Sequence, residues 1–136
     1  MKKPKLILAA TLAVAVLAGT WGMQTLNAQQ AGFTRVQLQD QDLTAPGRHV
    51  VQARADFVAG GEVGKHTHPG EEVSYVLEGT LLLEVAGQPP KTLKAGDSFF
   101  IPAGVVHAAK NVDKGSSKVL ATYIVEKGKP VTTPVK

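Results

Sequence analysis

Two stretches of the sequence decide the fold and the candidate chemistry. Residues 60–79 read GGEVGKHTHPGEEVSYVLEG, and residues 96–111 read GDSFFIPAGVVHAAKN. Between them they carry four side chains of metal-binding type, which are His66, His68, Glu72 and His107. Imidazole nitrogen and carboxylate oxygen together suit a divalent first-row transition metal. Four such ligands would leave open positions on a six-coordinate ion, and open positions allow a metal to take part in chemistry.

Strand geometry predicts that these side chains converge. Residues i and i+2 of a strand point to the same face, so His66 and His68 can aim at one point. A short Pro-Gly turn then reverses the chain and returns Glu72 from the adjacent strand, while His107 approaches from elsewhere in the sheet. Glu71 is a second acidic candidate, but motif spacing and strand parity both favour Glu72.

Short apolar segments separated by Gly and Pro make up the rest of the domain. Strands are predicted at residues 49–58, 62–68, 72–77, 80–85, 98–101, 105–109 and 119–125. Leu81, Leu83 and Val85 alternate with Leu82 and Glu84, which fits a sheet with two distinct faces. Many short strands with such breaks are typical of an all-β sandwich or barrel. A small closed barrel leaves interior room for one small ligand or ion.

Residues near the predicted site receive separate interpretations. Gly79 and Gly96 are expected at turns that need positive φ. His49 lies outside both stretches and is expected on the surface or a strand face. Asn111 is expected to form a turn or hydrogen bonds rather than to bind a metal. Ser74, two residues after Glu72, is the additional polar candidate close to the site.

Aromatic and aliphatic residues are expected to form the core or the pocket wall. Tyr123 could reach a substrate. Tyr75 has the opposite strand parity to Glu72, and we expect it to pack in the core. The remaining candidates for core or pocket wall are Leu81, Leu83, Phe99, Phe100 and Ile101.

The N-terminus has the pattern of an export signal. Lys2, Lys3 and Lys5 precede an apolar run over residues 6–18, and a basic segment followed by such a run is typical of signal peptides. Cleavage after Ala28 and an uncleaved anchor both remain open. The expected location is therefore periplasmic or secreted, or attached to the inner membrane by this segment.

These observations divide the chain into four parts. Residues 1–28 are predicted to be a signal peptide or N-terminal membrane anchor, and residues 29–47 an N-terminal extension. Residues 48–127 are predicted to form the barrel, and residues 128–136 a flexible tail.

Charge and cysteine content exclude several classes of protein. The formal net charge is +4, but three of the 15 basic residues lie in the N-terminal segment, and the remainder nearly balance the 11 acidic residues. No basic stretch suited to nucleic acid remains, so no nucleic-acid partner is expected. The chain has no cysteine, which rules out thiolate ligands and therefore zinc-finger, iron–sulfur and blue-copper sites.

Both stretches resemble the two motifs of the cupin superfamily. Residues 60–79 match G(X)5HXH(X)3,4E(X)6G, and residues 96–111 match G(X)5PXG(X)2H(X)3N, at every defined position. The resemblance implies a cupin-type antiparallel double-sheet β-barrel, or jelly-roll, that is frequently a homodimer. It also implies a divalent metal held by His66, His68, Glu72 and His107. Related cupins use manganese, iron, nickel, copper or zinc, so the identity of the metal stays open.

Three classes of function fit this reading. The favoured one is an exported enzyme with dioxygenase-like chemistry on a small organic substrate, in which Glu72 is both ligand and proton acceptor. A metal-dependent isomerase, lyase or decarboxylase would instead use the ion as a Lewis acid. A non-catalytic module that binds a metal or small ligand is the third. The sequence offers no phosphate loop, nucleophile motif or second acid–base pair that would point elsewhere.

Overall fold

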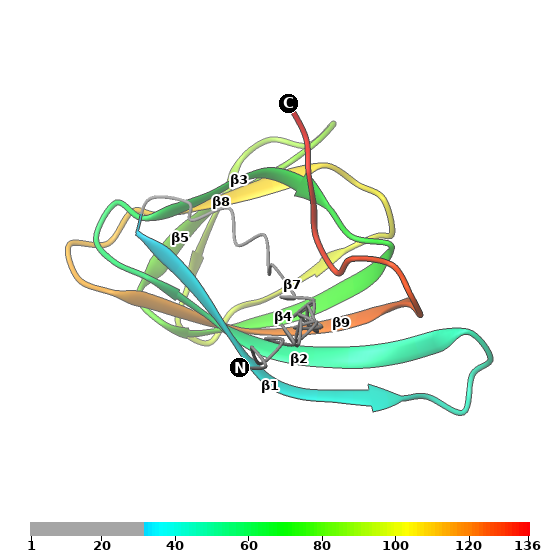
Figure 1. The fold of residues 1–136 in the computed structure, drawn as a ribbon. Helices are drawn as coiled ribbons and strands as arrows, with labels where there is room; N and C mark the ends of the chain where they lie inside the picture. Colours follow the sequence, from blue (N-terminus) through cyan, green and yellow to red (C-terminus); the bar gives the residue numbers. More distant parts are fainter. Residues whose placement is uncertain (1–31) are drawn as a thin grey trace, which may run out of the picture.

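Two antiparallel five-stranded sheets form the fold in the computed structural model, which describes residues 32–136 (Figure 1). The strands of sheet A, in spatial order, are β1 (Phe33–Asp42), β2 (Arg48–Phe57), β9 (Ser117–Glu126), β4 (Gly70–Glu78) and β7 (Ser98–Ile101). Those of sheet B are β10 (Thr133–Pro134), β3 (Glu62–Thr67), β8 (His107–Asn111), β5 (Thr80–Val85) and β6 (Lys91–Lys94). The described residues contain no helix. The prediction of an all-β, antiparallel double-sheet fold is confirmed.

Period-two burial explains why the two sheets face each other. Along β9, Val119, Ala121, Tyr123 and Val125 are buried, while the residues between them are partly exposed. Alternate side chains of a strand point to opposite faces, so one face of sheet A packs against the facing side of sheet B. Burial of these apolar side chains supplies the main stabilisation of such a sandwich.

Seven of the ten strands agree with the predicted ones to within two residues at either end. The sequence analysis placed no strand at β1, β6 or β10. The sequence of β1 is FTRVQLQDQD, and nine of its ten residues are exposed. A mostly polar edge strand lacks the hydrophobic alternation on which strand prediction depends. It forms because it pairs along β2, with a register shift between Gln37 and Gln39.

The C-terminal residues, expected as a loose tail, make long-range contacts. Thr133 and Pro134 pair with Thr67 and His66 of β3, and the Val135 amide donates to the Lys65 carbonyl at 2.9 Å. In Figure 1 this segment crosses from the end of β9 in sheet A to sheet B. The four-part division of the chain itself stays a prediction, and the expected signal or anchor lies outside the described residues.

The two turn glycines have the predicted backbone conformation. Gly79 has φ +79° and Gly96 has φ +98°, a region that residues with a Cβ rarely adopt. A Cβ at Gly79 would also collide with the Ser117 side chain and the Ser116 backbone. Glycine at this position therefore lets the turn between β4 and β5 pass directly against the start of β9.

Two aromatic predictions are wrong. Tyr75 and Phe100 were assigned to the core or pocket wall, but they are 46% and 58% exposed. Both lie on the outer face of sheet A, which no further layer of the described chain covers. Strand parity correctly separated Tyr75 from Glu72 but could not tell whether the opposite face was covered. Leu81, Leu83 and Ile101 are buried as predicted.

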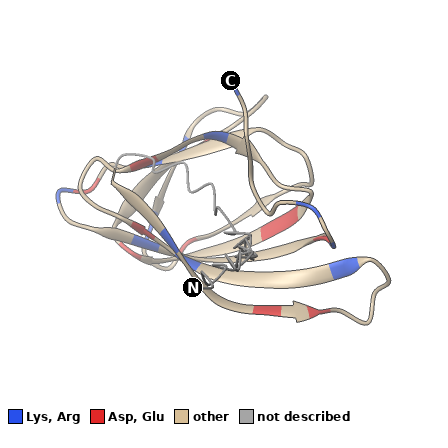
Figure 2. Ribbon diagram, in the orientation of Figure 1, with Lys and Arg blue, Asp and Glu red and all other residues tan. Residues whose placement is uncertain are grey.

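Charged residues are distributed over both sheets. Basic and acidic segments are interspersed in Figure 2, and several form ion pairs, such as Lys110 with Glu62 and Lys127 with Asp42. Within residues 32–136, no helix is long and apolar enough to span a membrane.

Candidate metal centre

The four predicted ligands come from both sheets and meet between them. His66 lies on β3 and is the cross-strand partner of His107 on β8. His68 follows the end of β3, and its carbonyl accepts a hydrogen bond from the Gly104 amide at 3.0 Å. Glu72 lies on β4. The Pro-Gly turn and the strand pairing thus bring together residues up to 41 positions apart in the sequence.

The three histidines form a compact, buried cluster. His66, His68 and His107 are each exposed by 5% or less. The His66 and His107 ring centroids are 4.2 Å apart, and each lies 4.9 Å from that of His68. One nitrogen from each ring lies within 4.8 Å of the others, so the three side chains could bind one metal ion.

Backbone carbonyls determine which ring nitrogens face the centre. The Nδ1 atoms of His66, His68 and His107 lie 2.7, 2.6 and 2.9 Å from the carbonyl oxygens of residues 64, 131 and 105. A carbonyl oxygen only accepts, so each Nδ1 must carry the proton. In the neutral ring, Nε2 is then unprotonated and carries a lone pair. Hydrogen bonding at the other nitrogen is how proteins orient metal-binding histidines.

Glu72 supplies the negative charge of the cluster. Its Oε2 lies 3.0 Å from His68 Nε2 and 3.2 Å from His107 Nε2, and its Oε1 accepts the Ser74 hydroxyl at 2.6 Å. The His68 and His107 Nε2 atoms have no conventional hydrogen bond despite being buried. Lone pairs and a carboxylate oxygen that converge in this way need a cation or a proton between them. This donor set fits a divalent transition metal.

The alternative acidic candidate is directed differently. Glu71 is half-buried and lies at the opposite strand parity to Glu72, which is 5% exposed. The structure therefore brings Glu72, rather than Glu71, to the histidines, as the motif spacing predicted.

Burial disfavours protonation of His66 and shapes the charge of Glu72. Desolvation lowers the pKa of His66 to about 4, against the opposing effect of its hydrogen bond to Gly64. Burial alone would raise the pKa of Glu72, but its contacts with His107, His68 and Ser74 outweigh burial and lower that pKa strongly. At neutral pH a deprotonated imidazole and a carboxylate are both ready to coordinate a metal.

Tyr123 forms one wall beside the cluster. Its ring centroid is 4.7 Å from that of His68, and the residue is 6% exposed. Burial, and then the charge of Glu72, raise the pKa of its hydroxyl above the usual range. Tyr123 therefore keeps its proton at neutral pH and can act as a hydrogen-bond donor at the site.

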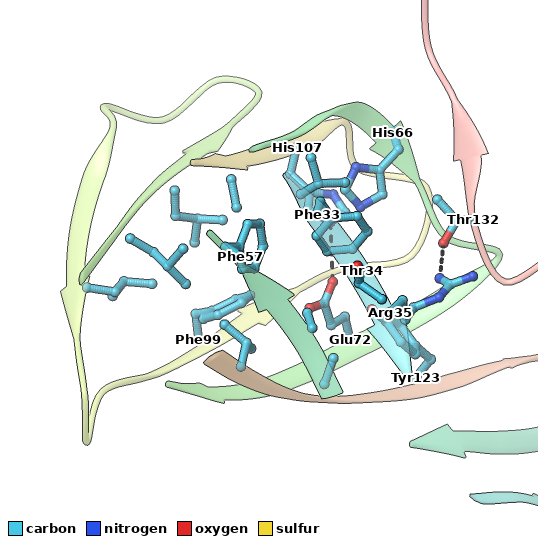
Figure 3. A pocket seen from close by; sticks show the side chains of 18 of the residues that line it. Phe33, Thr34, Arg35, Phe57, His66, Glu72, Phe99, His107, Tyr123 and Thr132 are labelled. Carbon is cyan, nitrogen blue, oxygen red and sulfur yellow. Dashed lines mark hydrogen bonds and ion pairs between the residues drawn. The ribbon is translucent and has the colours of Figure 1, made fainter. Parts of the chain in front are cut away.

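A cavity of about 450 Å³ opens directly from the cluster, and Figure 3 shows its lining. His66, His107 and Glu72 lie at one end. Most of the other lining side chains are apolar, among them Phe57, Leu81, Leu83, Leu93 and Phe99. This volume is in the range of small-molecule binding sites, ~300–1,000 Å³.

The start of β1 also lines this cavity and was missed by the sequence analysis. Phe33, Thr34 and Arg35 contribute to the wall (Figure 3). The Phe33 ring lies 5.0 Å from that of Phe57. Phe33 and Arg35 share a strand parity, but in a segment of polar composition that spacing alone did not indicate a pocket wall.

The two remaining polar candidates lie in other interactions. His49 Nδ1 lies 2.8 Å from Asp40 Oδ1, on the paired strands β1 and β2. Asn111 donates to the carbonyls of Val58 and Gly115, both at 2.8 Å. It also accepts from the Asp113 amide and the Ser117 hydroxyl. The prediction that Asn111 serves hydrogen bonding is confirmed.

The family assignment follows from a sequence match over the same residues. The family description "Cupin domain" matches residues 53–130, which span β2 to β9 and all four candidate ligands. The chain belongs to the cupin family. Strand β1, including Arg35, lies outside the matched residues.

Comparison with other cupins shows related sequences and the same fold. Germin-like protein subfamily 2 member 2 of Arabidopsis thaliana is 42% identical over 76 residues, which is 52% of this chain and 35% of that protein. An oxalate oxidase structure with the substrate analogue glycolate is 25% identical, with a TM-score of 0.62 over 76% of this chain and 55% of that one. The chain thus covers little more than a third of the curated relative.

A second structural neighbour shows how widely the fold is shared. The DMSP lyase DddQ of Ruegeria pomeroyi is 23% identical, with a TM-score of 0.64 over 76% of this chain and 52% of that one. At this identity the likeness concerns the fold alone. The activity must be argued from the site.

Proposed function

We propose that this cupin is an exported, metal-dependent enzyme that acts on a small organic substrate with dioxygenase-like chemistry. The observation that carries the proposal is the convergence of three imidazole Nε2 atoms and one carboxylate oxygen beside a cavity lined mostly by apolar side chains. A purely structural polar cluster would be expected to satisfy its hydrogen bonds internally. Here the buried Nε2 atoms of His68 and His107 instead face Glu72 Oε2 without a hydrogen bond.

The proposed metal ligands are His66, His68, His107 and Glu72. A bound manganese, iron, nickel, copper or zinc ion would supply Lewis acidity, and a redox-active one would also supply electron transfer. The Nδ1 hydrogen bonds hold the three rings in fixed orientations. The apolar side chains that line the cavity lower the local dielectric and so strengthen electrostatic interactions near the ligands.

Glu72 has two proposed roles, which its environment supports unequally. The Ser74 hydroxyl holds one carboxylate oxygen at 2.6 Å and leaves the other toward the histidines. The lowered pKa keeps Glu72 anionic, which suits a ligand, whereas a proton acceptor works best with a pKa near the working pH. We therefore propose that Glu72 acts mainly as a ligand. It would accept a proton only if a change in the surrounding charge raised its pKa.

The comparisons support a metal-dependent oxidation without deciding it. The oxalate oxidase neighbour is named for an oxidative reaction and holds glycolate, a small organic acid analogue. The structural alignment includes most of the barrel of this chain. Isomerase, lyase or decarboxylase chemistry is the alternative. It differs from oxidation in that turnover would not require dioxygen.

Elemental analysis followed by an oxygen electrode tests the proposal. The full-length chain, exported and purified without added metal or chelator, is expected to carry about one equivalent of a transition metal. Chelating diols, phenols and small acids are then screened for dioxygen consumption. Turnover that continues without dioxygen would instead support a lyase or isomerase. A protein that neither contains nor takes up metal would be a binding module, which contradicts the proposal.

A matched pair of histidine variants controls for adventitious metal. His107→Ala removes a proposed ligand, whereas His49→Ala removes a histidine that contacts Asp40 instead. Metal content and dioxygen consumption are expected to fall only in His107→Ala. Loss of metal from His49→Ala with retention in His107→Ala would overturn the ligand assignment. Glu72→Gln separates charge from geometry, because the amide oxygen can still coordinate but has lost its basicity.

We also propose a homodimer that forms through the outer face of sheet A. Val73, Tyr75 and Leu77 are each 46–47% exposed on β4, and Phe100, the cross-strand partner of Val73, is 58% exposed. A contiguous apolar face of this kind is typical of interaction surfaces. Light scattering should give twice the chain mass for the wild type and the monomer mass for Phe100→Lys. A monomeric wild type would contradict the dimer.

Export is the proposed route to the site of action. The support is the basic and apolar pattern at residues 2–18. Fractionation of the host cell is expected to recover the protein from the periplasm or medium, or from the inner membrane if the segment is retained. N-terminal sequencing would then locate any cleavage. Accumulation of the intact chain in the cytoplasm would contradict export.

A further inference from the structure

Arg35 brings a positive charge to the lining of the cavity. It is the one Lys or Arg among the residues that line it in the described part of the chain. It takes part in none of the ion pairs formed by residues 32–136, and residues 1–31 contain no Asp or Glu. A guanidinium at an apolar cavity without a carboxylate partner can pair with an anionic ligand.

Its contacts hold Arg35 in place beside the candidate metal centre. The guanidinium Cζ lies over the Tyr123 ring, 6.0 Å from its centroid. Nη1 donates to Thr132 Oγ1 at 2.6 Å (Figure 3). Tyr123 thus contacts both Arg35 and His68, whose ring centroid lies 4.7 Å from that of the tyrosine.

These contacts leave the arginine able to bind a ligand. A guanidinium has five N–H donors in a planar fork, and the two contacts use only part of them. Arg35 comes from the first residues of β1 and Thr132 from the segment before β10, so the pair joins the two ends of the described chain beside the cavity. The cation–π contact with Tyr123 and the hydrogen bond to Thr132 reduce the freedom that binding would have to remove.

The cavity gives the anion a defined context. Apolar side chains, including Phe33, Phe57, Leu83 and Phe99, cover the space beside Arg35. A volume of about 450 Å³ admits a molecule with an apolar ring or chain as well as a charged group. An acid would place its carboxylate on Arg35 and its apolar part against these side chains, with a further atom toward His66 and His107.

We propose that Arg35 is a specificity-determining residue that binds the carboxylate of a small organic acid whose apolar part occupies the cavity. The inference rests on the proposed function, because it names the substrate class of the same site. Its key residue lies on β1, outside the matched family residues. Strand β1 would then contribute to the preference for an acid as substrate, in addition to the candidate metal centre.

Calorimetry with paired acids and amides tests this assignment. Phenylacetate and 3-phenylpropionate are titrated into the full-length protein, and so are their primary amides, which have nearly the same shape without charge. The wild type is expected to bind at least one acid roughly tenfold more tightly than its amide, the scale of one charge-assisted hydrogen-bonded contact at a partly exposed site. Arg35→Gln should bring acid and amide to nearly equal affinity.

Three variants separate anion binding from general effects. Lys91→Gln removes the same charge from an exposed position on β6 and should leave the preference unchanged. Thr132→Val removes one of the contacts that hold Arg35 while keeping the guanidinium, and should reduce the preference without abolishing it. Arg35→Lys should retain part of the preference, because the ammonium keeps the charge but loses the planar fork. Circular dichroism and thermal unfolding verify that each variant folds.

Titrations of metal-loaded and metal-depleted protein distinguish this inference from the proposed function. A preference for the acid that depends on Arg35 in both forms supports the assignment, even if no enzyme activity is found. A preference that appears only in the metal-loaded form, and survives Arg35→Gln, would assign the carboxylate to the metal and overturn it. The absence of acid binding to the wild type at millimolar concentrations would also overturn it.

Discussion

The barrel contains two buried polar clusters that differ in how far their hydrogen bonds are satisfied. In the asparagine cluster, formed by Asn111 and Ser117 with their backbone partners, Asn111 uses both amide hydrogens and makes two contacts through its oxygen. In the histidine cluster, formed by His66, His68, His107 and Glu72, two Nε2 atoms have no conventional hydrogen bond. The second sequence motif contributes a residue to each cluster, Asn111 to one and His107 to the other.

This difference separates a structural role from a functional one. Asn111 is 1% exposed and ties the segment after β2 to the loop before β9, so its bonds all serve the fold. The histidines bind the fold only through Nδ1 and leave Nε2 for a cation. A buried polar group with unused capacity costs stability, which a bound ion would offset. Conversely, the fully bonded cluster has nothing left to offer a ligand.

The largest expected effect is on metal binding by the histidine cluster. Replacing His107 with Ala removes one lone pair and leaves Glu72 with one imidazole fewer. We expect metal affinity to fall by more than about 100-fold, since even residues that only orient a ligand contribute 10- to 100-fold. Competition with a colourimetric chelator measures it. An unchanged affinity would exclude His107 as a ligand.

The asparagine cluster should show the opposite response. Asn111→Ala leaves the carbonyls of Val58 and Gly115 and the amide of Asp113 without their partner. We expect the free energy of unfolding to fall by about 4 kcal/mol, because four hydrogen bonds of Asn111, each worth ~0.5–1.5 kcal/mol, are lost. Urea unfolding of metal-depleted protein measures this. Metal affinity of the folded variant should be unchanged. A large loss of metal affinity would contradict the assignment of a purely structural role to the asparagine cluster.

Lowering the pH should reduce the free energy of unfolding of the metal-depleted protein, because of titrating groups in the histidine cluster. The pKa of His66 is lowered from 6.5 to about 4, so between these values the unfolded chain binds a proton that the folded protein does not. Stability is therefore complete above pH 6.5 and declines toward pH 4, by up to about 3 kcal/mol. Glu72, whose pKa is also lowered, adds a further loss below its usual 4.5.

Urea unfolding of metal-depleted protein across this pH range measures the effect. In His66→Gln the slope between pH 6.5 and 4 should become shallower, since the titrating ring is gone. An identical slope in both proteins would show that His66 does not carry the dependence. The Asn111 cluster has no group that titrates in this window, so an Asn111 variant should keep the wild-type slope.

The smallest expected effect sharpens the comparison within the histidine cluster. Ser74 donates to Glu72 at 2.6 Å in a buried position. Ser74→Ala should lower the free energy of unfolding by about 1 kcal/mol and reduce metal affinity modestly, because the carboxylate loses its orienting partner. Chelator competition and urea unfolding test both effects. Ser117→Ala, its counterpart beside Asn111, should affect stability without affecting metal affinity.

Much of the site was predictable because the determining signals are local. The spacing of His66 and His68, and the return to Glu72 after a tight turn, follow from strand parity over seven residues. The positive φ of Gly79 and Gly96 also follows from local turn chemistry. Tyr75 and Phe100 could not be placed, since exposure of an outward face depends on whether another layer covers it.

The sequence alone determined the strand-rich fold, the four residues that meet between the sheets and the hydrogen-bonding role of Asn111, because period-two alternation and motif spacing act over short distances. Only the tertiary structure decided that β1 joins sheet A, that the C-terminal segment pairs with β3, and that Arg35 and Thr132 meet beside the cavity. The contact between Arg35 and Thr132 joins residues 97 positions apart. The stability of these segments comes from pairing with strands already in place, which no local pattern of residues encodes.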